Sequence, residues 1–113
     1  MRLCVRGEYR LEDFLKYSDE ELLSRFGKKE PEVMDYLLGK YKPLVRKKAN
    51  ALYLIGGDTD DLIQEGMIGL FKAVESFDQE KESSFYHFAE LCITRQMYSA
   101  VEASRRKKHA ALN

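Results

Sequence analysis

The sequence predicts an all-α fold, a compact bundle of about four helices. Three observations lead to this expectation. Apolar residues recur at spacings of three and four, no run alternates β-branched residues as a strand does, and the 113 residues contain only 2 prolines. A chain of this length builds one hydrophobic core, so we expect a single helical domain at residues 18–113, preceded by a partly ordered segment at residues 1–17.

The first helix of this bundle is expected to begin at Ser18. Ser18 and Glu21 have the spacing of a capping box, in which each side chain accepts a hydrogen bond from the backbone amide of the other residue. Gly27 is expected to end the helix in a left-handed conformation, which glycine adopts without steric cost. A short turn of helix before Ser18 is indicated by three apolar residues, Leu11, Phe14 and Leu15.

A second helix is predicted from Pro31, a residue suited to the first helical position, to about Ile55, before a pair of glycines. Pro43 lies inside this helix and removes one backbone hydrogen bond, so we expect a kink or break near residues 39–41. The apolar stripe of the helix consists of Val33, Leu37, Leu38, Tyr41, Leu44, Val45, Ala49 and Leu52. The remaining face is basic and carries Lys40, Lys42, Arg46, Lys47 and Lys48.

A third helix is predicted from the acidic cap at residues 58–61 to about Ser76. Gly66 belongs to its buried stripe, and both Gly66 and Gly69 allow a neighbouring helix to approach closely. The other members of that stripe are Leu62, Ile63, Leu70, Ala73, Val74 and Phe77. The opposite stripe joins an acidic end to an apolar patch and consists of Asp60, Asp61, Gln64, Met67, Ile68 and Phe71. Because this stripe is unusually apolar for a surface exposed to solvent, it indicates a site that binds a partner.

A last helix is predicted from a cap at Ser83 or Ser84 to about Ser104. Its inward residues are Phe85, Ala89, Cys92, Ile93, Met97, Ala100 and Val101. Its outward stripe consists of Phe88, Leu91, Arg95, Tyr98, Glu102 and Arg105. Surfaces that bind unpaired nucleic acid typically combine basic residues with aromatic rings on which bases can stack. In this helix the aromatic rings are Phe85, Tyr86, Phe88 and Tyr98.

Charge is sorted along the chain although the formal net charge is zero. Residues 36–55 carry +5, residues 58–82 carry −6 and residues 83–113 carry +3. We interpret these blocks as surfaces for different partners, and we expect them to lie apart in space.

The residue types that catalysis or metal binding requires are not arranged for either. Cys4 and Cys92 are too few for a disulfide scaffold, and His87 and His109 fit no metal-ligand spacing. No GK[ST] sequence follows a glycine pair to make a phosphate loop. We therefore expect no enzyme activity, no metal and no cofactor. Because no signal peptide and no apolar run of roughly 20 residues is found, we also expect a cytoplasmic protein without membrane contact.

Three segments resemble bacterial RNA polymerase sigma factors. Region 2.2 of that family, which binds core polymerase, resembles residues 61–78, DLIQEGMIGLFKAVESFD. Region 2.1 resembles residues 40–47, KYKPLVRK, and the promoter-melting helix resembles residues 85–96, FYHFAELCITRQ. This last segment, followed by RRKKH at residues 105–109, is especially similar to the sigma-H type. The resemblance covers residues 18–113, regions 1.2 to 2.4, and implies a transcription initiation factor that recognises and melts the minus-ten element.

The resemblance also implies the residues that make each contact. The residues implied to contact the clamp helices of the largest polymerase subunit are Asp61, Gln64, Glu65, Met67 and Phe71. Contacts with promoter DNA, on the non-template strand of the minus-ten element, fall to Phe88, Arg95, Tyr98, Ser99, Arg105, Arg106 and Lys81. Positions near downstream non-template bases correspond to Tyr41 and Leu44. An anti-sigma factor is a further candidate partner.

The sequence departs from primary sigma factors in two ways. Leu91 and Cys92 stand where those proteins carry two adjacent tryptophans, which favours an alternative sigma factor with a narrower promoter set. The second DNA-binding domain, which reads the minus-thirty-five element, is expected to be absent because the sequence stops at Asn113. The alternative hypothesis is a helical sigma-like adaptor or regulator module that binds polymerase or a regulator without promoter recognition. That module would not need the stripe from Phe88 to Arg106.

Overall fold

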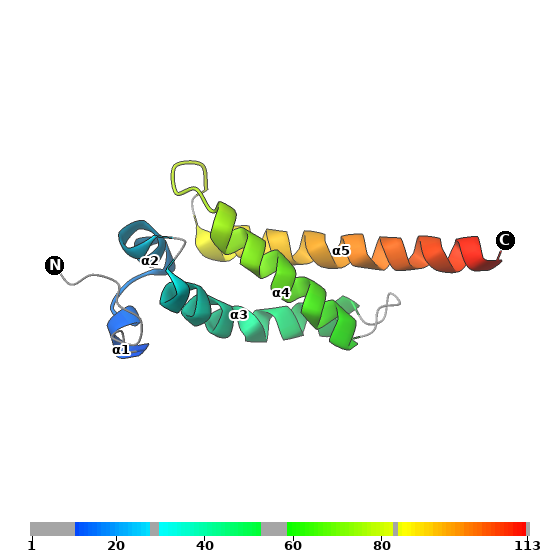
Figure 1. Ribbon diagram of the computed structural model, residues 1–113, viewed down its shortest axis with the longest axis horizontal. Coiled ribbons are helices and arrows are strands. Elements are labelled where there is room, and N and C mark those ends of the chain that lie inside the picture. The colour runs from blue at the N-terminus through cyan, green and yellow to red at the C-terminus, as the bar shows by residue number, and fades with distance from the viewer. Residues whose placement is uncertain (1–10, 28–29, 53–58, 83, 113) are drawn as a thin grey trace.

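The computed structural model describes residues 11–27, 30–52, 59–82 and 84–112, and within them the chain forms helices and no strand. The helices are α1 (Leu11–Phe14), α2 (Asp19–Phe26), α3 (Pro31–Leu52), α4 (Thr59–Ser76) and α5 (Phe85–Leu112). The predicted all-α fold is confirmed. In Figure 1, α4 crosses α5 and lies beside α3. Helices α1 and α2 lie together at one end of the molecule, and the last turns of α5 extend past the other helices.

The amino-terminal part of the fold follows the sequence closely. The predicted turn of helix is α1, and the part of the predicted N-terminal segment at residues 1–10 lies outside the described residues. The capping box is confirmed: the Glu21 amide donates to Ser18 Oγ at 3.1 Å, and the Ser18 amide donates to Glu21 Oε1 at 2.8 Å. Gly27 ends α2 with φ 84° and ψ 157°. The positive φ was expected, but this ψ is extended, so the left-handed helical cap is wrong.

Helix α3 runs from Pro31 to Leu52 without interruption, so of the kink or break predicted near residues 39–41, the break is wrong. An interior proline costs about 3 kcal/mol, whereas burying one Val- or Leu-sized side chain contributes roughly 1.5–3 kcal/mol. The buried stripe therefore outweighs the missing hydrogen bond; it consists of Val33, Leu37, Tyr41, Val45, Ala49 and Leu52. Leu38 and Leu44 are half-buried rather than core residues. The predicted end at Ile55, like the cap residue Asp58 of the next helix, lies outside the described residues.

Helices α4 and α5 approach each other closely where two glycines remove the side chains. A Cβ atom on Gly69 would lie 2.7 Å from the Cys92 carbonyl oxygen. A Cβ atom on Gly66 would lie 2.7 Å from Val45 Cγ1 and would overlap the Met97 methyl group. The prediction that these glycines admit a neighbouring helix is confirmed, and Gly66 marks the point where α3, α4 and α5 meet.

Helix α5 begins at Phe85 and continues to Leu112, well beyond the predicted end at Ser104. Ser84 is its cap, because Ser84 Oγ accepts a hydrogen bond from the His87 amide at 3.3 Å; Ser83 lies outside the described residues. The buried side of α5 ends at Val101, and residues 102–107 are exposed. Of the predicted inward residues, Cys92 and Ala100 are only half-buried. Residues 102–107 of α5 thus present their side chains to solvent.

Candidate functional site

The outward side of α4 carries Asp61, Gln64, Ile68 and Phe71, which we call the α4 face. Asp61 and Gln64 are exposed, and the apolar side chains of Ile68 and Phe71 are 44% and 42% exposed. Met67 lies beside them but is half-buried against the core. Because large apolar side chains this exposed are solvated unfavourably, two of them one turn apart indicate a contact surface.

Glu65 lies one turn after Asp61, at the edge of the α4 face that adjoins α5. It is half-buried, and its Oε1 accepts a hydrogen bond from Gln96 Nε2 of α5 at 2.9 Å. The same Gln96 amide accepts, through Oε1, a hydrogen bond from Lys72 Nζ at 3.3 Å. Gln96 therefore bridges two α4 residues. Neither Gln96 nor Lys72 was a predicted site residue. In the sequence, only their positions on the sides of the two helices that face each other could have indicated this contact.

The outward side of α5 carries the exposed residues Leu91, Arg95, Tyr98, Glu102 and Arg105, which we call the α5 stripe. Leu91 is 44% and Tyr98 47% exposed. Ser99 and Arg106 are exposed next to the stripe. Arg105 approaches Glu102 at 3.9 Å, but both side chains are mostly exposed, so this pair contributes little to stability and leaves the guanidinium accessible.

Phe88, which lies one turn before Leu91 of the α5 stripe, is half-buried rather than exposed. Its ring centroid lies 5.8 Å from that of Phe77, the buried residue that follows α4. Phe77 contacts Phe85 at 5.5 Å, and Phe85 contacts Tyr41 at 5.3 Å. Phe85 is fully buried, so the prediction that its ring could stack on a base is wrong. The Phe88 ring therefore packs against an aromatic cluster of Phe77, Phe85 and Tyr41.

Lys81 is exposed in the loop between α4 and α5. Asp78 shapes this loop: its carbonyl oxygen accepts from the Lys81 and Glu82 amides at 3.0 and 2.9 Å, and its carboxylate accepts from the Glu80 amide at 3.0 Å. Glu80 and Glu82 flank Lys81 in the sequence, and their negative charges weaken the attraction of Lys81 for a phosphate.

Tyr41 lies in the core, where its hydroxyl donates a hydrogen bond to Asp19. Burial and the neighbouring carboxylate raise the pKa of Tyr41 far above its ordinary value of 10.0. Lys40 Nζ lies 2.7 Å from the other carboxylate oxygen of Asp19; burial opposes its charge, but the hydrogen bond to Asp19 raises the pKa of Lys40 on balance. Tyr41 is thus a structural residue, whereas Leu44 is half-buried.

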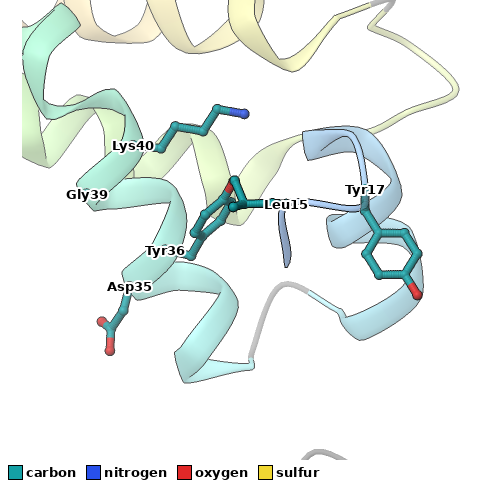
Figure 2. Close-up of a pocket in the computed structure, with 6 residues that line it drawn as sticks. All are labelled: Leu15, Tyr17, Asp35, Tyr36, Gly39 and Lys40. Carbon is teal, nitrogen blue, oxygen red and sulfur yellow. The ribbon is translucent and has the colours of Figure 1, made fainter. Parts of the chain in front are cut away.

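A further cavity lies away from these surfaces. It measures about 530 Å³ and lies between α3 and the connection from α1 to α2. Figure 2 shows its lining: Leu15, Tyr17, Asp35, Tyr36, Gly39 and Lys40. None of these is a predicted site residue, and two of them already stabilise the fold, because Lys40 pairs with Asp19 and the Tyr36 ring packs 5.3 Å from Phe14.

The expected separation of acidic and basic surfaces is wrong at one end of the molecule. A groove of about 390 Å³ between α4 and α5 brings Asp61 and Glu65 together with Lys107. Helix α4 runs in roughly the opposite direction to α5 where the two helices cross (Figure 1), and residues of the first two turns of α4 line this groove together with residues 100–107 of α5. Acidic and basic residues therefore meet in this groove instead of lying on separate surfaces.

Among the described residues, no group of three or more His, Cys, Asp and Glu side chains could hold a metal ion. Within the same part of the chain, no helix has both the length and the apolar character needed to cross a bilayer. Burial raises the pKa of the Cys92 thiol, so this group is neutral at pH 7.

Comparison with known proteins gives these surfaces a context. The Sigma-70 region 2 family matches residues 37–107, which include every predicted site residue. The chain belongs to the sigma-70 region 2 family. The RNA polymerase sigma-H factor of Bacillus subtilis (strain 168) is 43% identical over 108 residues, which make up 96% of this chain and 50% of that relative. The sigma-H factor of Bacillus licheniformis is 42% identical over 108 residues, 96% of this chain and 48% of that relative.

The predicted resemblance to sigma factors of the sigma-H type is thus confirmed. A more distant relative, the RNA polymerase sigma-D factor of Bacillus subtilis (strain 168), is 33% identical over 79 residues, 66% of this chain and 31% of that relative. The chain spans about half the length of its two sigma-H relatives. No solved structure matched the chain.

Proposed function

We propose that this region 2 chain belongs to a transcription initiation factor that binds core RNA polymerase and then recognises and opens the minus-ten promoter element. The observation that carries this proposal is a pair of exposed surfaces on adjoining helices. The α4 face joins polar to apolar side chains, and the α5 stripe joins aromatic to basic side chains. The relatives, which are named as sigma factors of RNA polymerase, support a function that uses both surfaces.

The α4 face is suited to a helical protein partner. Ile68 and Phe71 would be buried at the centre of the contact, where apolar and aromatic residues supply most of the binding free energy. Asp61 and Gln64 would lie at the polar end of the contact and select a partner with complementary donors. Met67 would add apolar area, and Glu65 would act by holding Gln96. The clamp helices of the largest polymerase subunit are the partner we propose.

The α5 stripe is suited to a DNA strand with unpaired bases. Stacking of a base on an aromatic ring contributes about 1–3 kcal/mol, which is comparable with the cost of unpairing one base. Phe88 would support an extruded base because Phe77 holds its ring in place. Tyr98 and Arg95 would contact the upstream part of the element, while Ser99, Arg105, Arg106 and Lys81 would contact phosphates.

Opening of the promoter by this mechanism uses binding free energy alone. The α5 stripe would favour the unpaired strand over the duplex, because a base can stack on a protein aromatic ring only after it has left the duplex, whereas phosphates are accessible on both. No bond is made or broken, so no catalytic side chain is required of the chain.

The test is a two-step binding experiment with core RNA polymerase from Bacillus subtilis. The labelled chain is first titrated with core polymerase, with unlabelled Bacillus subtilis sigma-H factor as the competitor. The complex then selects from a pool of single-stranded oligonucleotides of random sequence. We expect competable binding and enrichment of one short motif. Absence of polymerase binding would contradict the proposal, and polymerase binding without any enriched motif would favour the adaptor alternative.

A further inference from the structure

The exposed side of α4 carries opposite charges at its two ends. Asp61 lies in the first turn of the helix, Ile68 near its middle and Lys72 in its second half, and all three side chains are exposed. Gln64, Ile68 and Lys72 follow one another at intervals of four residues, so they form one row along the helix. The α4 face is therefore acidic at its start and continues past its apolar middle to a positive charge.

This pattern is complementary to itself when two copies of α4 lie antiparallel. In a two-fold symmetric contact every pair of residues occurs twice, once from each copy. Asp61 and Lys72 are separated by about three helical turns, and Gln64 and Phe71 by about two, so the members of each pair lie on the same edge of the helix. The midpoints of the two pairs differ by one residue, about 1.5 Å along the helix. One two-fold axis near Ile68 therefore places Asp61 opposite Lys72 of the second copy and Gln64 opposite Phe71.

The side chains of this row supply both an apolar centre and charged ends. Ile68 and Phe71 are 44% and 42% exposed, and burying them against a second copy removes apolar surface from water. Lys72 donates one hydrogen bond to Gln96 Oε1 at 3.3 Å, and an ammonium group has three donors, so donors remain for a carboxylate of the second copy. Charge pairs at the two ends of such a contact fix its register and its antiparallel direction.

Two features limit the strength of this contact. One face of a single helix buries less surface than a permanent dimer interface does, so the association is weak and reversible. Glu75, which is exposed one turn after Phe71, comes near the acidic start of α4 in the second copy, where like charges repel.

We propose that the chain forms a weak antiparallel homodimer through the exposed side of α4, in which Asp61 of each copy pairs with Lys72 of the other copy. A second copy is favoured as the occupant because this one side of α4 supplies both members of each pair. The inference goes beyond the proposed function and does not depend on it. It adds a form of regulation, because the dimer covers the α4 face and a second copy then competes with polymerase for Ile68 and Phe71.

Sedimentation equilibrium of the chain without polymerase, from about 10 μM to 1 mM, measures the dimer. The decisive variants are Asp61→Lys and Lys72→Asp. Each places like charges together at both symmetry-related contacts, so each variant alone should dimerise at least about tenfold more weakly than wild type. Mixed in equal amounts, the two variants present opposite charges at both contacts and should form a heterodimer with about the wild-type affinity.

Two further variants serve as controls, and circular dichroism verifies that every variant stays helical. Lys107→Ala removes an exposed lysine from the groove that Asp61 also lines, and it should not weaken the dimer. Glu75→Ala removes the like charge and should tighten the dimer.

Three results would overturn the inference. The wild-type chain could remain monomeric over the whole concentration range, the two charge-reversed variants could each dimerise as well as wild type, or their mixture could remain monomeric. Dimerisation is measured without polymerase, so these results leave the proposed function untouched. If core polymerase binds the wild-type chain without dissociating the dimer, the assignment of the α4 face to polymerase fails and the dimer stands.

Discussion

Asp19 is the buried charged side chain among the residues that the structure describes, with 7% of its surface exposed. Burying a carboxylate is costly unless hydrogen bonds and an opposite charge compensate for the lost water. Both are present, because one oxygen accepts from Tyr41 and the other from Lys40 at 2.7 Å. From the sequence, Asp19 is an acidic residue in the first turn of a helix, and nothing there predicts its two partners on α3.

The substitution Tyr41→Phe tests this cluster. It should lower the free energy of unfolding at pH 7 by about 1–3 kcal/mol, because the Asp19 carboxylate loses one donor. The raised pKa also sets a pH dependence. Stability from the protonated hydroxyl is fully present below the ordinary pKa of 10.0 and is lost as the pH rises above it, since the unfolded tyrosine ionises first.

Urea denaturation of wild type and Tyr41→Phe, followed by circular dichroism from about pH 7 to pH 11, measures both effects. The stability difference should narrow above about pH 10, by up to about 1.4 kcal/mol per pH unit. Curves that stay parallel throughout would show that Tyr41 does not hold its proton through Asp19.

At the scale of single helices, α2 fixes the start of α5. Glu20 Oε2 accepts a hydrogen bond from the Phe85 amide at 2.6 Å, and Asp19, next to Glu20, holds Tyr41 against the Phe85 ring. The first amides of a helix have no partner inside the helix, so a carboxylate from elsewhere in the fold serves as a cap. This cap sets the position of Phe88, which lies one turn further along α5.

We expect Glu20→Ala to lower the free energy of unfolding by about 1–3 kcal/mol, because it leaves the buried Phe85 amide without an acceptor. Glu20→Gln keeps an acceptor oxygen and should cost less. Glu75→Ala, at an exposed position of α4, is the control and should change the free energy of unfolding by no more than about 0.5 kcal/mol. Hydrogen exchange at Phe85 gives a local measurement. Equal effects of Glu20→Ala and Glu75→Ala would contradict the capping role.

The crossing of α4 and α5 makes a second prediction at this scale. In Gly69→Ala the new methyl group would meet the Cys92 carbonyl oxygen at 2.7 Å, and backbone cannot move aside as a flexible side chain would. We expect a loss of about 1–3 kcal/mol. Gly39→Ala is the matched control, because nothing lies within 4 Å of that position, and it should stabilise α3 by about 0.5–1 kcal/mol. Equal thermal shifts in the two variants would be inconsistent with the observed packing.

Across the whole molecule, periodicity predicts which side of each helix is buried but not which helix it meets. The stripes of α3 and α4, the capping box and the two packing glycines follow from local pattern. The hydrogen bonds of Asp19, Glu20 and Gln96 join residues far apart in sequence, and no local pattern contains them. Helix α3 continues through Pro43 for a related reason, since its buried stripe is stabilised by contacts with other helices.

The arrangement of charge also belongs to this scale. Lys48 of the basic α3 face pairs with Glu90 of α5 at 2.9 Å, and this hydrogen bond lowers the pKa of Glu90. Asp61 and Lys107 share the groove between α4 and α5. Some charged residues of these blocks therefore contact or lie beside residues of opposite charge within the fold. What distinguishes the two candidate surfaces is the side chains they expose, apolar on α4 and aromatic with basic on α5.

Oxidative footprinting of side chains tests directly whether these surfaces serve different partners. Ile68, Phe71, Leu91 and Tyr98 are between 42% and 47% exposed, so each starts from similar reactivity for its type. Core RNA polymerase should protect Ile68 and Phe71 and leave Leu91 and Tyr98 reactive. A single-stranded oligonucleotide carrying the selected motif, added to that complex, should then protect Tyr98 and Leu91. Protection of Tyr98 by polymerase alone, or of neither pair by either partner, would contradict the assignment of α4 to polymerase and α5 to promoter DNA.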